Sequence, residues 1–223
     1  MSKRKKVKSE LLNSPEYEDT EKSGLKIVIL PAKHLQSVSF RIVVRTGSRY
    51  ETDKTIEAAH FMEHMCFKGT TQRTSKDITT KLDQLGVSYN AATYPELTIY
   101  TGTTDNENLK ESLDIFADML KNSKMTAKDM KIEANTVTQE LTTIVQTPSD
   151  YVEQLLLESV FKGNTLGLPI QRTIHSSKNI KLKNMRDFYN QYYIPSNMTV
   201  IIAGNIDSTV SNLLEFIKTK FKK

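Results

Sequence analysis

The sequence lacks several features that would each assign it to a particular class of protein. It has a single cysteine, Cys66, so no disulfide can form within the chain, which fits a reducing compartment. No stretch approaches the roughly 20 apolar residues that cross a bilayer, so we expect no membrane span. There is also no internal repeat and no linker rich in glycine and serine. With 38% hydrophobic and 26% charged residues, the composition is typical of a soluble globular protein.

The sequence also lacks a basic surface pattern, although its net charge is +5. Residues 1–8 hold five basic side chains and no acidic one, and the last six residues hold four lysines. Between these two ends, acidic residues outnumber basic ones. No basic stripe alternates with aromatic residues as a nucleic-acid groove requires, so we expect no nucleic-acid partner.

Residues 1–23 are polar and contain few side chains that a core could bury, which predicts a flexible leader. They lack the apolar stretch of a secretory signal, and they carry acidic residues that a transit peptide avoids. We interpret the basic run 3–6 as a solubilising tail rather than a nuclear-import signal. We therefore expect an intracellular, cytoplasmic protein whose residues 24–223 form a single domain.

The remaining chain alternates between two kinds of pattern. Segments rich in β-branched and aromatic residues predict five strands, over 25–30, 37–44, 87–92, 97–103 and 198–204. Segments with helical spacing of apolar residues predict seven helices, over 56–67, 76–85, 106–121, 127–145, 148–161, 181–193 and 208–221. Strands near both ends with helices between them predict an α+β fold, a mostly antiparallel sheet with helices packed on one face.

The segment AAHFMEHMCFKGT, residues 58–70, carries the most specific chemical pattern in the chain. His60 and His64 are four residues apart, so a helix places both imidazoles on one face. Zinc favours nitrogen ligands, and Glu63 beside that face could take a proton from an attacking water. An idle surface pair of histidines is the alternative. The apolar neighbours predict a buried helix, and because buried histidines need partners, we favour a metal site.

A metal site of this kind needs a third protein ligand. The predicted helix 127–145 carries Glu133 and Glu140, which are seven residues apart and lie nearly on one face. An isolated glutamate on a helix usually faces solvent. The residues alone therefore leave the third ligand open.

Five segments, in order, resemble motifs of the pitrilysin/insulinase peptidases, or inverzincins, which include the mitochondrial processing peptidase. HFMEHMCFKGT resembles their H-x-x-E-H zinc helix. The other four are GLKIVILPAKHLQSVSFRIVVRTGSRYE, NAATYPELTIYTGT, IEANTVTQEL and FYNQYYIPSNMTVIIAGNID, which resemble the opening hairpin, a second hairpin, the helix of the distal ligand and the closing segment. The resemblance covers nearly all of residues 24–223.

The resemblance implies a zinc metalloendopeptidase that hydrolyses peptide bonds in peptides or unfolded segments. It implies one Zn²⁺ per chain, held by His60, His64 and Glu140. Glu63 would be the general base, and Glu133 would orient a ligand from outside the metal's own shell.

The resemblance also implies how a substrate would bind. In the family, the strand that corresponds to Asn90 and Ala91 binds the substrate backbone as an added strand. From the residues alone, Asn90 could equally well be a turn or strand-end residue.

The chain departs from the family in one loop and in length. NTLGLPIQRT has Leu168 where the family has an arginine, and Arg172 near a usual glycine. Active members enclose a peptide between two homologous halves, and this chain resembles only the zinc-binding half. We expect a homologous second domain or subunit, in a homodimer or heterodimer. The alternative is a non-catalytic subunit that keeps the peptidase fold and binds a partner or a peptide.

Overall fold

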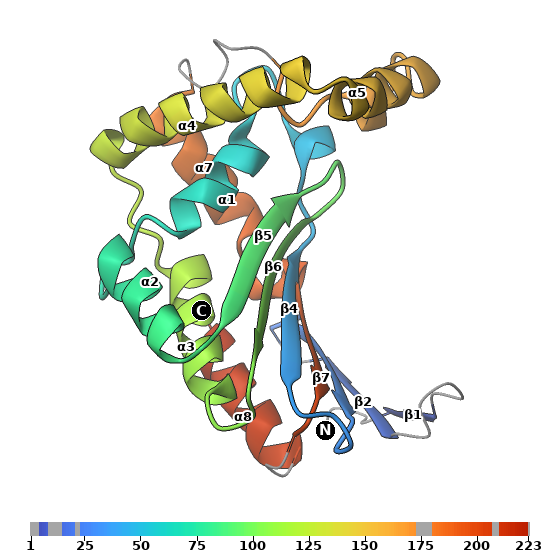
Figure 1. The fold of residues 1–223 in the computed structure, drawn as a ribbon, viewed down its shortest axis with the longest axis vertical. Helices are drawn as coiled ribbons and strands as arrows, with labels where there is room; N and C mark the ends of the chain where they lie inside the picture. The colour runs from blue at the N-terminus through green and yellow to red at the C-terminus, as the bar shows by residue number, and fades with distance from the viewer. Residues whose placement is uncertain (1–4, 9–14, 21–22, 173–179, 207–209, 223) are drawn as a thin grey trace.

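The computed structural model describes residues 5–8, 15–20, 23–172, 180–206 and 210–222 (Figure 1). One seven-stranded sheet runs through the molecule in the order β1-β2-β3-β7-β4-β6-β5. The strands are β1 Lys5–Lys8, β2 Pro15–Thr20, β3 Lys26–Pro31, β4 Val38–Val44, β5 Ser88–Thr93, β6 Thr98–Thr104 and β7 Met198–Gly204. All neighbouring strands are antiparallel except β3 and β7, which bring the two ends of the domain together in parallel.

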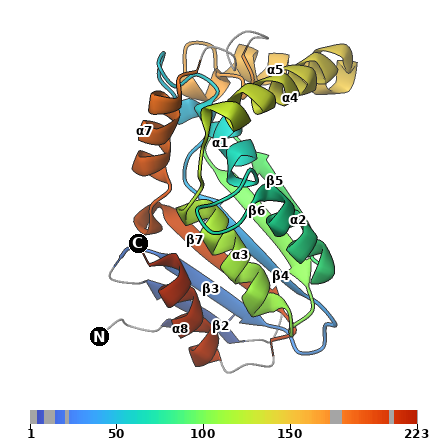
Figure 2. The same cartoon turned by 90° about the vertical axis from the view of Figure 1, so that its left-hand side faces the viewer.

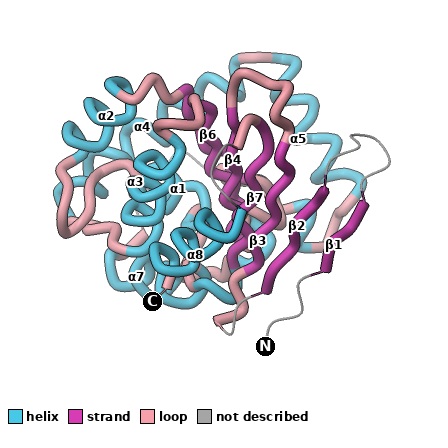
Figure 3. The backbone as a smooth tube through the Cα atoms, turned by 90° about the horizontal axis from the view of Figure 1, so that it is seen from below, coloured by secondary structure: helices cyan, strands magenta, loops and turns pink. Residues whose placement is uncertain are grey.

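Helices connect the strands and cover one side of the sheet (Figures 2 and 3). They are α1 Ala58–Cys66, α2 Ser75–Gln84, α3 Leu109–Lys121, α4 Ala127–Gln146, α5 Pro148–Val160, α7 Leu182–Tyr192 and α8 Val210–Phe221. The first two residues of the predicted helix 208–221 lie outside the described residues. Among the residues that the structure describes, no helix is both long and apolar enough to cross a membrane.

The sheet buries one face and exposes the other. Along β4, Val38, Phe40 and Ile42 are buried, whereas Ser39 and Arg41 between them are exposed. Successive strand residues point to opposite faces, so this alternation matches a sheet with a helical layer on one side only. The predicted α+β class, with a mostly antiparallel sheet and helices on one face, is confirmed.

Two strands, β1 and β2, lie within the residues for which the sequence predicts a flexible leader. Residues 17–20 of β2 pair antiparallel with 26–29 of β3, and β1 pairs in turn with β2. A sheet edge offers unpaired main-chain N–H and C=O groups, and pairing with them needs no apolar side chains. Composition gave no indication of these two strands, because it reports on side-chain burial alone.

The site helices lie at one end of the sheet (Figure 1). Helix α1 is buried because six of its nine residues pack into the core. Thr126 is the N-cap of α4, and its hydroxyl accepts from the Asp129 N–H at 3.1 Å, which satisfies an otherwise unpaired donor. Proline at position 148 then opens α5, since its fixed φ suits a first helical turn.

Candidate metal centre

Helix α1 presents His60 and His64 toward α4, and the Glu63 side chain contacts Thr93 of β5. The Glu51 carboxylate fixes the start of α1, because it accepts the N–H groups of Glu57 at 2.9 Å and Ala59 at 3.0 Å. The first N–H groups of a helix have no partner within the helix, and the Glu51 side chain satisfies two of the main-chain N–H groups at this end. Burial raises the pKa of Glu51 to about 8, although its two main-chain hydrogen bonds and Arg172 oppose that rise.

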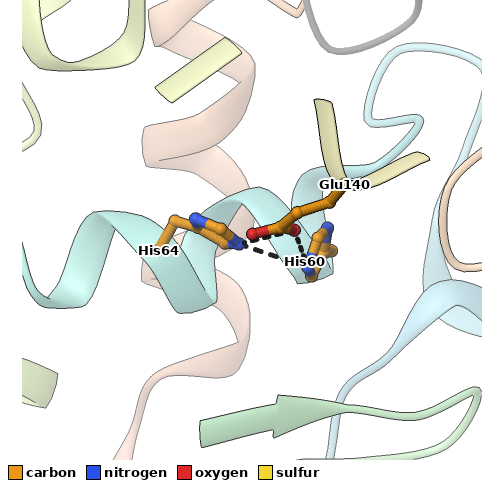
Figure 4. Close-up of side chains that lie close together, drawn as sticks. All are labelled: His60, His64 and Glu140. Atoms are coloured by element: carbon orange, nitrogen blue, oxygen red, sulfur yellow. Dashed lines mark hydrogen bonds and ion pairs between the residues drawn. The ribbon is translucent and has the colours of Figure 1, made fainter. Parts of the chain in front are cut away.

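Three ligand atoms converge between α1 and α4 (Figure 4). The Nε2 atoms of His60 and His64 lie 3.2 Å apart, and Glu140 Oε2 lies 3.5 Å from the first and 3.4 Å from the second. In a tetrahedral zinc site with bonds near 2.0–2.1 Å, two ligand atoms are separated by about 3.3 Å. The spacing of the three ligand atoms therefore fits a zinc ion. In the described part of the chain, no other group of three histidine, cysteine or acidic side chains lies close enough together to hold a metal ion.

Glu133 binds the far side of His64 and takes no part in this triangle. Its Oε2 lies 3.1 Å from His64 Nδ1, and its Oε1 pairs with Lys68 Nζ at 2.6 Å. Burial opposes the charge of Glu133, but the hydrogen bonds from His64 and Lys68 lower its pKa. Because a carboxylate only accepts, Nδ1 of His64 carries a proton, and its Nε2 is directed at Glu140 and His60.

The two histidines differ in charge. Burial, together with the charge on His64, lowers the pKa of His60 to about 4, so its ring is neutral. Burial also acts against a charge on His64, but its hydrogen bonds to Glu133 and Glu140 outweigh this and raise its pKa to about 9. The hydrogen bond from His64 is in turn the main reason why the pKa of Glu140 is lowered. Without a metal ion, His64 therefore holds one positive charge where a cation would bind.

Glu63 lies beside the triangle without belonging to it. The Thr93 hydroxyl donates to its Oε2 at 2.5 Å. Burial raises the pKa of Glu63 above its usual value, and the Thr93 hydrogen bond and the charge on His64 partly oppose that rise. A carboxylate with a raised pKa is a better proton acceptor, which is the property that a general base near neutral pH requires.

A cavity of about 920 Å³ opens beside these side chains. Residues 89–93 of β5 line one side, Asn90 and Ala91 among them, and α5 lines another side with Asp150, Glu153 and Leu157. β5 is the last strand of the sheet, and within the described part of the chain no strand pairs with its outer edge. An extended peptide in the cavity would meet unpaired main-chain groups.

The sequence reasoning missed a fourth side chain that contacts the triangle. The Gln171 amide nitrogen lies 3.1 Å from His60 Nδ1 and 3.4 Å from Glu140 Oε2. The next residue, Arg172, donates its main-chain N–H to the Glu57 carboxylate at 2.6 Å. Its guanidinium also donates to Glu51 Oε2 at 3.3 Å. The departure in NTLGLPIQRT pointed to this loop. Gln171 and His60 are 111 positions apart, so no local sequence pattern could predict their contact.

Comparison with known proteins identifies the family. The profile of the family described as "Insulinase (Peptidase family M16)" matches residues 27–174, and "Peptidase M16 inactive domain" matches residues 179–223. The chain therefore belongs to the M16 peptidase family, and the family predicted from the sequence is confirmed.

Curated relatives are named as proteases. The chain is 32% identical to an "Uncharacterized zinc protease" of Rickettsia felis, over 83% of this chain and 45% of that protein. It is also 32% identical to the "Uncharacterized zinc protease YmxG" of Bacillus subtilis, over 85% and 46%. It is 33% identical to the "Mitochondrial-processing peptidase subunit beta" of Caenorhabditis elegans, over 74% of this chain and 36% of that protein. The chain thus spans less than half the length of these relatives.

Solved structures agree on the fold. A protease from Helicobacter pylori superposes with a TM-score of 0.86 at 23% identity, covering 93% of this chain and 50% of that one. The periplasmic protease PqqL from Escherichia coli gives 0.84 at 24% identity, covering 93% and 24%.

Proposed function

We propose that this chain is the zinc-binding half of a metalloendopeptidase that hydrolyses peptide bonds in peptides or unfolded segments. One observation carries the proposal. Three ligand atoms, from His60, His64 and Glu140, converge at tetrahedral spacing beside a carboxylate, Glu63, that does not join them. A site with three protein ligands and a free base is suited to hydrolysis.

The contacts of each side chain support a separate role in the reaction. A zinc ion held by the three ligands would polarise a peptide carbonyl and lower the pKa of a bound water to roughly 7. Glu63 accepts a proton from the attacking water and returns it to the departing amine. Thr93 holds that carboxylate in place through its 2.5 Å hydrogen bond. Glu133 keeps the His64 ring oriented, with its Nδ1 proton directed away from the ligand triangle.

The substrate would lie along β5. A peptide strand added to the open edge at Asn90 and Ala91 gains main-chain hydrogen bonds, and its scissile bond comes within the cavity that contains Glu63. Main-chain recognition is largely independent of side chains. We therefore expect broad sequence tolerance and a requirement for an extended, unfolded segment.

A homologous second domain or subunit would complete the enzyme, in a homodimer or a heterodimer. The chain spans less than half of its curated relatives, and residues 24–223 would be one domain of the pair. Helix α5 supports this, because none of its 13 residues is buried by the rest of the described chain. Its exposed apolar side chains are Tyr151, Val152, Leu155, Leu156, Leu157 and Val160. A surface of this kind marks an interaction site.

The experiment that tests the proposal is Glu63→Gln. The amide has nearly the same shape but cannot accept the proton, so cleavage of an unfolded polypeptide should fall by about 10²–10⁴-fold. Zinc content should not change, because Glu63 is not a ligand. Glu111→Gln is the matched control, since Glu111 is exposed on α3 and pairs with the half-buried Lys81. Unchanged cleavage by Glu63→Gln would refute the assigned base.

A non-catalytic subunit is the second candidate, favoured by the exposed apolar surface of α5. Such a subunit would bind a partner or an extended peptide through the same fold. A wild-type chain that binds zinc but cleaves nothing, alone or with a homologous half, would favour this reading. Robust cleavage by the purified chain would exclude it. The cytoplasmic location remains a prediction from the sequence.

A further inference from the structure

Residues 165–172, the wall segment, form a side of the cavity to which the proposed function gives no role. Within this segment, residues 167–171 line the cavity without a break. The wall segment packs closely on the end of α5, since a Cβ atom added at Gly167 would lie 2.7 Å from the main-chain oxygen of Phe161. Helix α5 has no buried residue and gives little support itself. The position of the wall segment therefore depends on its contacts with the rest of the described chain.

The end of the wall segment is bound to the start of α1. The main-chain N–H of Arg172 donates to the Glu57 carboxylate at 2.6 Å, and its guanidinium donates to Glu51 Oε2 at 3.3 Å. The Glu51 side chain is fully buried, and Glu57 is 1% exposed. Earlier in the segment, the Ser48 hydroxyl donates to the main-chain oxygen of Leu168 at 3.2 Å. Two buried carboxylates and one hydroxyl thus hold the wall segment at two points.

The contact between Arg172 and Glu51 is the strongest of these by its chemistry. Among the described residues, Arg172 is the one cation that forms an ion pair with Glu51. A buried carboxylate that loses its charged partner destabilises a protein strongly. Burial raises the pKa of Glu51 to about 8, and the charge on Arg172 opposes that rise, so above this pH both groups are charged. A charge-assisted hydrogen bond is roughly twice as strong as a neutral one such as that from Ser48.

The backbone of Glu57 is a second, independent feature of this junction. Its φ of 64° and ψ of 11° lie in the left-handed region, which is uncommon for a residue with a side chain. Such a conformation persists only where the surrounding contacts hold it. It occurs at the residue whose buried carboxylate accepts from Arg172. The chain is therefore constrained at the point where the wall segment meets α1.

We propose that Arg172 is a positioning residue that locks the wall segment onto the start of α1 and so fixes one side of the cavity. The described lining of the cavity ends at Gln171, so Arg172 acts through its neighbours in the chain. A peptide that binds in the cavity then meets a wall that is already ordered. This consequence for peptide binding rests on the proposed function, whereas the lock itself does not.

Amide hydrogen exchange of the purified chain, read by mass spectrometry after digestion, measures the lock without enzyme activity. Above the pKa of Glu51, Arg172→Leu should speed exchange in the wall segment by about 10–100-fold, because a hydrogen bond between charged groups is lost. Exchange in α1 and β4 should stay within about twofold of wild type, since Glu51 still accepts two main-chain N–H groups of α1 and its N-cap. Arg172→Lys keeps the charge and should recover most of the protection.

The matched control is Arg73→Leu. Arg73 is also half-buried and also pairs with acidic side chains, Asp114 and Asp118, but none of the three lines the cavity. This variant should leave exchange in the wall segment within about twofold of wild type. Circular dichroism checks that both variants fold, and Arg172→Gln replaces Arg172→Leu if the latter does not.

The consequence for binding is measured by fluorescence anisotropy with fluorescein-labelled β-casein, an unfolded polypeptide. Glu63→Gln is present in every chain of this series to prevent cleavage. Adding Arg172→Leu should weaken binding by about 3–10-fold, because a loosened wall must be ordered when the peptide binds. Adding Arg73→Leu should leave the affinity unchanged.

The outcomes separate this inference from the proposed function. Unchanged exchange in the wall segment of Arg172→Leu would overturn the inference. So would faster exchange spread equally over α1 and β4, which would make Arg172 a residue of overall stability. Faster exchange confined to the wall segment, without weaker casein binding, would overturn its role in ordering the cavity for a peptide. A Glu63→Gln chain that binds no casein, with the expected exchange result, would contradict the proposed function and still support the lock.

Discussion

Helices α1 and α5 both line the cavity and both are rich in apolar residues, yet they lie in opposite environments. Helix α1 buries six of its nine residues, whereas α5 buries none of its 13. Phe61 of α1 is fully buried, and Leu156 of α5 is 59% exposed. The difference indicates that the described chain packs the helix of the candidate metal centre by itself. Helix α5 leaves apolar side chains exposed, and a surface of this kind is typical of an interaction site.

The largest contrast should appear in stability. Phe61→Ala removes a ring from the core and should lower the free energy of unfolding by about 3–5 kcal/mol. Leu156→Ala should change it by less than about 0.5 kcal/mol, since the side chain already faces solvent. Urea unfolding of the metal-free chain, followed by circular dichroism, measures both. Similar losses of stability for the two variants would mean that α5 is packed in solution, and would contradict the difference in burial between α1 and α5.

The next largest effect separates the two glutamates of α4. Glu140→Gln removes a charged ligand and should weaken zinc binding by more than about 100-fold. Glu133→Gln removes only the partner of His64 Nδ1 and should cost about 10–100-fold. Chelator competition ranks the two variants. The reverse order would assign Glu133 as the ligand and contradict the geometry of the triangle.

That choice between glutamates shows how far the sequence could lead. The spacing of His60 and His64 predicted a shared face, and the apolar neighbours predicted the burial of α1; the structure agrees on both. Helical spacing placed Glu133 and Glu140 on one face but could not say which reached Nε2 of the histidines, because that depends on how α4 crosses α1. The resemblance to the family supplied the assignment, and the described contacts support it.

Three other features could not be predicted from the sequence, and each has a physical reason. The sequence predicted α5 as a helix, but its exposure depends on what packs against it, which periodicity does not report. Gln171 lies in a loop 111 positions from His60, so only the folded chain brings the two together. The strands β1 and β2 form through main-chain pairing at a sheet edge, to which a polar composition gives no clue.

A smaller effect concerns pH. His64 has a pKa of about 9 in the metal-free chain, because Glu133 and Glu140 outweigh its burial, so below that pH zinc must displace a proton from it. Because this proton is lost more easily as the pH rises, apparent zinc affinity should rise with pH, by up to about tenfold per unit between pH 6 and 8. Competition titrations at three pH values, with a chelator corrected for its own protonation, measure the slope. A flat profile would mean that His64 is already neutral without metal.

The most direct test of the central claim, that this chain alone assembles a metal site, is native mass spectrometry of the purified protein. One spectrum reports zinc content and subunit number together. We predict one zinc per chain, absent from His64→Ala, in a species whose mass also shows whether the α5 surface pairs with a second copy. A chain that remains metal-free with zinc in excess, or a His64→Ala variant that keeps its zinc, would contradict the account.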